Sequence, residues 1–272
     1  MSATPTKIAI HGAAGRMGQR LVALASVDRD LKVVAAIDAP GNPRLGQDAG
    51  LLAGVGELGL PLVDKLAVTA DVVIDFSSPA GALAITETCL ARGQALVLAT
   101  TGLEAEQQAR VREAARKIPL LWAPSMSLAV NLAMKLSAVA AAALKEHPTG
   151  ADVEIVERHH RYKEDAPSGT ALKFGEIISG VMGQKVSRHG REGRLGARPH
   201  GEIGYHALRT GDNPGEHTIV FGLLGETLEI SVKATNRDCY AHGALAAAKF
   251  LCGKPAGLYS MSDVLQSSLG AP

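Results

Sequence analysis

Residues 8–18 read IAIHGAAGRMG, a short apolar run followed by three closely spaced glycines. The run predicts a strand, and the helical spacing that begins at Arg16 predicts a helix directly after the glycines. Asp38 closes the next apolar run. A dinucleotide pyrophosphate needs backbone N–H groups at short range and a helix N-terminus, which Cβ atoms would obstruct. The pattern therefore favours a dinucleotide site over a plain glycine turn, with nicotinamide preferred to flavin.

Short apolar runs and helical stretches alternate through the first half of the chain, as in a parallel sheet with helical crossovers. The strands expected are 7–11, 32–37, 71–76, 95–99 and 119–123, and the helices expected are 16–26, 79–92 and 104–117. Residues 39–61, rich in Pro and Gly, are expected to form a long loop.

The second half of the chain has a different order of elements. A helix is expected at 130–145, a strand at 152–158, a helix at 168–182, a Gly- and Arg-rich loop at 187–201, and strands at 202–208, 216–222 and 226–234. Strands joined without helices indicate an open, antiparallel or mixed sheet. We therefore expect an α/β chain with a Rossmann-type domain, residues 1–130 completed by 241–272, and a smaller α+β domain, residues 131–240.

The bulk composition excludes several classes of protein. The chain has 272 residues, with 28 basic and 27 acidic side chains, so nothing indicates a nucleic-acid or membrane surface. Three cysteines without CxxC spacing argue against a disulfide framework and a thiolate metal site. No signal peptide or membrane span is visible. We expect a cytoplasmic protein whose partners are small molecules and sister subunits.

The carboxyl ends of parallel strands should complete the cofactor site, because ligands of open α/β sheets bind there. The residues expected to contact the cofactor are Gly12, Ala13, Ala14, Gly15, Arg16, Met17, Asp38, Ala99, Thr100, Thr101, Gly102, Ala123, Pro124, Ser125 and Met126. Ser77 and Ser78 follow another strand, but capping of the next helix is at least as good an interpretation. The Asp38 carboxylate disfavours a 2′-phosphate, so NADH is favoured; Arg16 and Arg44 leave NADPH possible.

A second motif, ERHHRYKEDAPSGTALK, occupies residues 157–173. His159, His160 and Lys163 follow an expected strand, and Ser168 is a plausible N-cap for the next helix. The free N–H groups at a helix start form an anion pocket. With a lysine and an imidazole beside it, the pocket suits an acidic substrate that is reduced with proton donation.

Three other interpretations of this motif were open. It could be a solvated surface loop. It could hold a metal with Glu157 and Asp165, although a protonated lysine is a poor ligand and HExxH spacing is absent, so we expect no metal. Lastly, the two carboxylates could neutralise Arg158, Arg161 or Lys163.

The motifs resemble those of the dihydrodipicolinate reductase (4-hydroxy-tetrahydrodipicolinate reductase) family. The matching stretches are GAAGRMG, ATTG at 99–102, ERHHRYKEDAPSGTALK, IGYHALRTGDNPGEHTIVF at 203–221 and GLYSMSDVL at 257–265, so the resemblance spans nearly the whole chain. It implies reduction of the cyclic substrate to tetrahydrodipicolinate in lysine and diaminopimelate biosynthesis, in a homotetramer. By resemblance, His159 and Lys163 do the proton work, and His160, Lys163, Ser168, Gly169 and Thr170 bind the substrate.

Six positions depart from the family pattern: Ala99, Ser125, Ala129, Thr210, Thr227 and Val232. They leave the ring substrate open, so a related reductase for another cyclic imine dicarboxylate is one alternative. A non-catalytic dinucleotide sensor and a metal hydrolase built on the two histidines are others. A phosphorylating semialdehyde dehydrogenase is disfavoured, because no cysteine is expected to open a helix at a loop facing the site.

Overall fold

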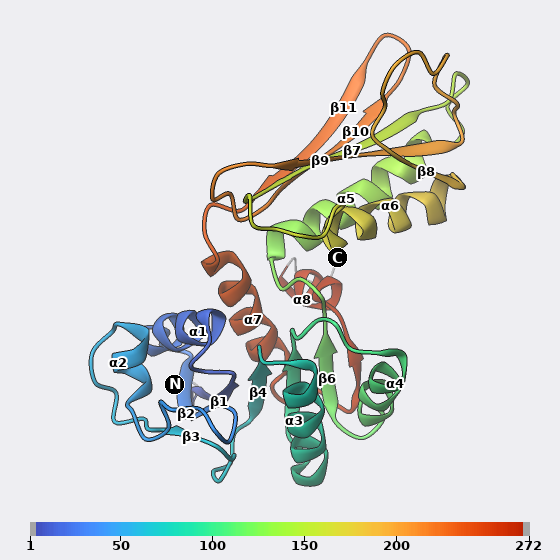
Figure 1. Ribbon diagram of the computed structural model, residues 1–272. Helices are drawn as coiled ribbons and strands as arrows, with labels where there is room; N and C mark the ends of the chain where they lie inside the picture. The colour runs from blue at the N-terminus through green and yellow to red at the C-terminus, as the bar shows by residue number, and fades with distance from the viewer. Residues whose placement is uncertain (1–3, 269–272) are drawn as a thin grey trace. The chain divides into compact units, whose positions relative to one another are not determined.

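The computed structural model describes residues 4–268. The chain divides into two compact units, Met1–Leu128 with Arg237–Pro272, and Ala129–Asn236. The ends 1–3 and 269–272 of the expected first domain lie outside the described residues. Each unit has its own sheet (Figure 1).

The sheet of the first unit has seven strands in the order β12-β6-β5-β4-β1-β2-β3, and its strand pairs are parallel. The strands are β1 Thr6–His11, β2 Leu31–Ile37, β3 Leu62–Val63, β4 Val72–Asp75, β5 Ala95–Leu98, β6 Pro119–Trp122 and β12 Gly257–Tyr259. From the adjacent strands β1 and β4, the chain adds β2 and β3 on one side of the sheet and β5, β6 and β12 on the other. The loops that leave the carboxyl ends of β1 and β4 therefore run in opposite directions, which creates a switch point. Ligands of doubly wound sheets bind at such a point.

Helices cover both faces of this sheet. They are α1 Arg16–Ser26, α2 Ala49–Ala53, α3 Pro79–Arg92, α4 Ala105–Ala114, α7 Asp238–Leu251 and α8 Met261–Ser268. Alternate strand residues feed two cores: Ile8 and Ile10 pack with α1 and α7, whereas Ala9 packs with α3 and α4. Strands buried on both faces explain the nearly continuous apolar runs of the sequence.

The second unit carries a five-stranded mixed sheet in the order β11-β10-β7-β9-β8. Its elements are α5 Leu128–Leu144, β7 Asp152–His159, α6 Gly169–Met182, β8 Val186–His189, β9 Glu202–Arg209, β10 Glu216–Gly222 and β11 Thr227–Lys233. Strand β7 pairs parallel with β9 and antiparallel with β10. Helices α5 and α6 lie on one face of the sheet, where Phe174 and Phe221 are fully buried (Figure 1). The predicted fold class, a Rossmann-type sheet with a smaller mixed-sheet α+β unit, is confirmed.

Short elements account for the errors in the expected secondary structure. The expected loop 39–61 contains α2, which begins where Asp48 accepts hydrogen bonds from the N–H groups of Gly50 and Leu51. The expected loop 187–201 overlaps β8, an edge strand whose residues are all exposed. Strand β12 and helix α8 were not expected as elements at all. Segments of two to eight residues have too few turns or alternations to give a periodic signal.

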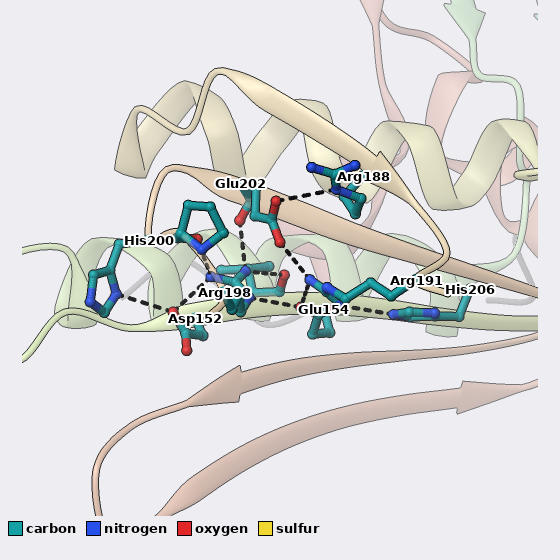
Figure 2. A network of polar contacts seen from close by, with 10 residues as sticks. Asp152, Glu154, Arg188, Arg191, Arg198, His200, Glu202 and His206 are labelled. Atoms are coloured by element: carbon teal, nitrogen blue, oxygen red, sulfur yellow. Dashed lines mark hydrogen bonds and ion pairs between the residues drawn. The ribbon is translucent and has the colours of Figure 1, made fainter. Parts of the chain in front are cut away.

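Charged side chains hold the rest of the Arg-rich loop on the second sheet. Arg191 binds both oxygens of Glu154, at 3.0 and 2.7 Å, and Arg198 binds Glu154 at 2.8 Å and Asp152 at 2.7 Å (Figure 2). Burial alone would raise the pKa of Glu154, but hydrogen bonds from the two guanidinium groups lower it to about 2. The loop therefore buttresses β7, the strand that ends at His159.

Candidate active site

The turn after β1 depends on glycines for steric reasons. Gly12 has a φ of 79°, and a Cβ there would overlap the carbonyl group of Phe76. A Cβ at Gly18 would overlap the backbone of Gly12 and Ala13, so α1 can approach the turn only with glycine at this position. Side-chain-free backbone close to a helix start is what a bound pyrophosphate requires.

The N-terminus of α1 is open to a ligand. Its N-cap is Gly15, which has extended backbone angles and provides no side-chain cap, and both Gly15 and Arg16 are exposed. The first N–H groups of a helix have no intrahelical acceptor, and they attract anions. The glycine turn therefore fits the phosphates of a dinucleotide.

A pocket of about 230 Å³ adjoins this helix start. Its lining contains six residues that were expected from the sequence: Arg16, Met17, Ala99, Pro124, Ser125 and Met126. It also contains Phe76, Arg237 and Tyr240, which sequence reasoning missed. Tyr240 and Arg237 come from the start of α7, more than a hundred residues away in the chain, so no local motif could have assigned them.

The remaining expected cofactor residues lie around the same strand ends. Thr100 is buried and its hydroxyl donates to Asp75, whereas Thr101 is exposed beside Gly102, whose φ is 79°. Ala123 is buried in the core next to Met126. Ser78 caps α3 by accepting a hydrogen bond from the N–H of Gly81, so the capping interpretation of Ser78 is confirmed.

Asp38 follows β2 and closes over the glycine turn. Its Oδ2 accepts a hydrogen bond from the N–H of Ala14 at 2.8 Å, and its Oδ1 accepts from Asn42 and from the N–H of Ala39, both at 2.9 Å. Partial burial would raise the pKa of Asp38, but these hydrogen bonds lower it. The carboxylate is therefore an anion held at the position where the second strand meets the turn.

The second candidate region centres on a buried carboxylate in the second unit. Glu157, 1% exposed, accepts a hydrogen bond from Nδ1 of His159 at 2.6 Å. Arg209, opposite His159 in the sheet, binds both oxygens of Glu157 at 2.8 Å. The N–H of Ser168 donates to Glu157 at 3.0 Å. Burial alone would raise the pKa of Glu157, but hydrogen bonds from Arg209, His159 and Ser168 lower it.

This arrangement fixes both the orientation and the charge of His159. Because Nδ1–H of His159 donates its hydrogen bond to Glu157, Nε2 is the ring atom left for chemistry. Nε2 lies against Gly215, where an added Cβ would come within 2.9 Å of it. Burial lowers the pKa of His159, although the hydrogen bond and the charge of Glu157 oppose the shift. The imidazole is therefore neutral near pH 7 until negative charge arrives beside it.

Lys163 and His160 occupy the turn that follows β7. The Lys163 ammonium binds Asp165 at 2.6 Å, so one of the expected neutralising pairs is confirmed. Glu157 instead pairs with Arg209, and Arg158 lies 3.6 Å from Glu216. Nδ1 of His160 is buried without a hydrogen-bond partner among the described residues. A buried polar atom without a partner needs an explanation, and a bound ligand is one such explanation.

Helix α6 begins beside these side chains. Ser168 is its N-cap and accepts a hydrogen bond from the N–H of Ala171, while its hydroxyl lies 3.0 Å from Nε2 of His217. Ser168 is only 2% exposed, so its polar groups serve the scaffold, whereas Gly169 is exposed and Thr170 is half-buried. Burial lowers the pKa of His217 to about 4, so this imidazole is neutral. The helix start thus presents N–H groups to an anion.

Cysteines and possible metal ligands are the remaining reactive groups of the described residues. No group of three or more His, Cys, Asp or Glu within 4–268 is placed to hold a metal ion. Cys239 lies in the first turn of α7, where the sequence did not predict a helix-opening cysteine, but burial raises the pKa of its thiol. A thiol with a raised pKa is a poor nucleophile. No helix of the described residues is long and apolar enough to cross a membrane.

Comparison with known proteins agrees with both regions. Residues 6–126 match the family model "Dihydrodipicolinate reductase, N-terminus", and residues 129–265 match "Dihydrodipicolinate reductase, C-terminus". A 4-hydroxy-tetrahydrodipicolinate reductase of Rhodopirellula baltica is 56% identical, with 98% of each chain covered. That of Alkalilimnicola ehrlichii is 45% identical, over 96% of this chain and 98% of the relative.

A solved structure leads to the same family. Dipicolinate-bound dihydrodipicolinate reductase from Paenisporosarcina sp. TG-14 is 26% identical, with a TM-score of 0.76, and covers 96% of this chain and 99% of that one. An amine dehydrogenase from Mycobacterium smegmatis, 13% identical with a TM-score of 0.65 over 96% of each chain, shares the fold. The chain belongs to the dihydrodipicolinate reductase family, whose members are nicotinamide-dependent oxidoreductases.

Proposed function

We propose that the chain reduces 4-hydroxy-tetrahydrodipicolinate to tetrahydrodipicolinate in lysine and diaminopimelate biosynthesis, with a reduced nicotinamide dinucleotide. The observation that carries the proposal is the Glu157–His159 pair beside Lys163 and the start of α6, in a member of this family. Two carboxylates of the substrate need cations and N–H donors, and the reduced ring needs a proton.

The residues around the glycine turn fit the dinucleotide. Gly12 and Gly18 leave the backbone bare, α1 offers uncapped N–H groups, and the adjacent pocket is lined by Phe76 and Tyr240. The bound dinucleotide supplies the hydride. The protein's own residues bind it, orient it and exclude water from the apolar side of the pocket.

His159 and Lys163 supply the proton and the positive charge. Hydride addition to the conjugated imine leaves negative charge that protonation or a nearby cation offsets. The arriving dicarboxylate favours protonation of the otherwise neutral His159, whose Nε2 is the free ring nitrogen. Lys163 then exchanges its bond with Asp165 for a substrate carboxylate, and shares the proton transfer with His159.

The other substrate contacts assigned here are His160, Gly169 and Thr170. Nδ1 of His160 has no hydrogen-bond partner within residues 4–268, and the exposed Gly169 lies at the open start of α6. Ser168 contributes by capping that helix and by donating its N–H to Glu157, so its contact with substrate is indirect.

We favour NADH as the cofactor, with NADPH as a second substrate of lower affinity. An ionised Asp38 repels a 2′-phosphate, and neither Ala39 nor Pro40 provides a cation next to it. Arg16 lines the adjoining pocket and keeps NADPH possible.

A homotetramer is the assembly that we propose. Helices α5 and α6 cover one face of the second sheet (Figure 1). The opposite face presents the half-buried Val156 and Val220 and the paired hydroxyls of Thr218 and Ser231. Burying this face between copies would remove apolar area from water. Sedimentation of the full chain should give four times the chain mass; a monomer would contradict the assembly.

The decisive experiment follows nicotinamide oxidation by absorbance, with enzymatically generated 4-hydroxy-tetrahydrodipicolinate and each cofactor in turn. Oxidation that depends on the substrate supports the reductase, and a lower KM for NADH than for NADPH supports the cofactor assignment. Binding of NADH without oxidation would favour the dinucleotide sensor. Activity on another cyclic imine dicarboxylate alone would favour the related reductase.

A further inference from the structure

A buried polar network lies under the cofactor loops and has no part in the proposed proton transfer. Its centre is Asp75, the last residue of β4, whose exposure is 0%. Nδ1 of His11 lies 2.6 Å from its Oδ1, the Ser77 hydroxyl donates to the same oxygen at 2.6 Å, and the Thr100 hydroxyl donates to Oδ2 at 2.5 Å. A carboxylate with no exposed surface costs several kcal/mol unless charge or hydrogen bonds offset the cost, so each donor matters.

The donors come from the loops that form the cofactor site. His11 is the last residue of β1 and directly precedes Gly12, Thr100 begins the turn after β5, and Ser77 follows Phe76. Backbone bonds join the same segments: the N–H of Phe76 donates to His11, and the N–H of Ser77 donates to Thr100 Oγ1 at 3.0 Å. The network therefore ties three neighbouring strand ends together at one carboxylate.

His11 differs from the other donors in two respects. Within the contacts described for Asp75, it is the one partner that can carry a positive charge. The His11 ring also lies close to the first turn of α3. A Cβ added at Gly81, in that turn, would lie 3.2 Å from Cε1 of His11. Asp75 from β4 contacts His11 directly, and Asp38 after β2 is the other acidic group that interacts with it; Ser77 and Thr100 contribute neutral hydroxyls to the network.

We propose that His11 is a positioning residue for the nicotinamide dinucleotide: its bond to the buried Asp75 fixes the glycine turn relative to the Phe76 and Thr100 loops. The proposal rests on the proposed cofactor site. His11 itself does not take part in hydride or proton transfer. Its contribution is to dinucleotide affinity, because a displaced turn would misalign the N–H groups that receive the phosphates.

The test compares His11→Ala with His11→Asn in the full-length protein, by calorimetric titration with NADH and by steady-state kinetics. Asparagine keeps an N–H donor near the position of Nδ1, and alanine removes it. We expect alanine to raise the Kd and the KM for NADH about tenfold or more, with kcat at saturating NADH within about twofold, as for the loss of one hydrogen bond to a charged group. Asparagine should restore most of the affinity.

Gln94→Ala is the matched control. Gln94 is also buried, and its side-chain amide donates a hydrogen bond to the Ala70 carbonyl. Gln94 directly precedes β5, so it lies at the amino ends of the strands, opposite the cofactor loops. Gln94→Ala should lower the free energy of unfolding without changing the Kd for NADH. If His11→Ala also leaves the Kd unchanged, or lowers kcat alone, the positioning role is refuted.

A fourth variant, Gly12→Val, separates this proposal from the cofactor site itself. If Gly12→Val abolishes NADH binding while both His11 variants bind normally, the site stands and the role of His11 falls. If NADH binding survives Gly12→Val, the cofactor site is misplaced and the inference falls with it. Should His11→Ala not fold, the comparison of His11→Asn with His11→Leu serves the same purpose.

Discussion

The cofactor region and the substrate region of this chain are held in place by different forces. The glycine turn of the first unit is shaped by sterics: Gly12 and Gly18 are required because any Cβ would overlap neighbouring backbone. The region around His159 is shaped by charge, through a carboxylate with 1% exposure that three donors satisfy. A steric requirement places particular residue types at fixed positions, so it can be recognised in the sequence. A charge network joins residues that can lie anywhere in the sequence, so it cannot.

Removing the charge at Lys163 should give the largest effect. We expect Lys163→Ala to lower kcat about 10²- to 10⁴-fold, the usual contribution of a positioned acid or base, without unfolding the protein. Lys173→Ala is the control, because Lys173 forms a comparable surface pair with Glu176 on α6. A near-normal kcat for Lys163→Ala, measured by nicotinamide absorbance, would remove this residue from the mechanism.

Adding a single methyl group to the glycine turn should come next. Gly18→Ala forces α1 away from Gly12 and Ala13, and we expect it to cost about 1–3 kcal/mol of unfolding free energy and most of the NADH affinity. Gly180→Ala, in α6, meets open space and should be neutral or slightly stabilising. Equal stabilities of the two variants in urea would show that the turn is not sterically determined.

The pH dependence of stability tests the charge-based region. An unfolded histidine binds its proton near pH 6.5, but the buried His217 does so only near 4. The unfolded state therefore gains protons first as pH falls, and stability should drop by up to about 3 kcal/mol between pH 6.5 and 4. The free energy of unfolding of His217→Gln, measured in urea, should not show this drop. Identical pH dependence of stability in both proteins would contradict the assignment to His217.

The smallest effect is expected at Asp38. Replacing it with Asn removes the negative charge but keeps a side chain of the same size, so NADH affinity should fall by a few-fold and NADPH affinity should fall less or rise. Calorimetric titration with both cofactors measures the ratio. Equal losses of affinity for the two cofactors would mean that Asp38 acts only through its hydrogen bonds to Ala14 and Asn42, and does not contact the ribose.

The same contrast explains what could be predicted from the sequence. The Rossmann-type sheet, the mixed second sheet and helices such as α1 and α3 were predicted, because their apolar periodicity is long and regular. His159 and Lys163 came from a compact local motif. Arg209 and His217 could not be found in this way, because only tertiary pairing brings them to His159. His11 and Asp75 were not singled out, because each closes an apolar run in the sequence and only the pairing of β1 with β4 brings the two side chains together.

The return of α7 to the first sheet sets the order in which the protein can mature during synthesis. Ala241, Ala244 and Leu251 belong to the same core as Ile8 and Ile10, so the part of this core that α7 covers stays exposed while residues 129–236 are being made. The second unit, by contrast, is continuous in sequence. A chain that ends near residue 236 would leave the apolar residues that pack against α7 exposed, and exposed apolar surface of this kind promotes aggregation.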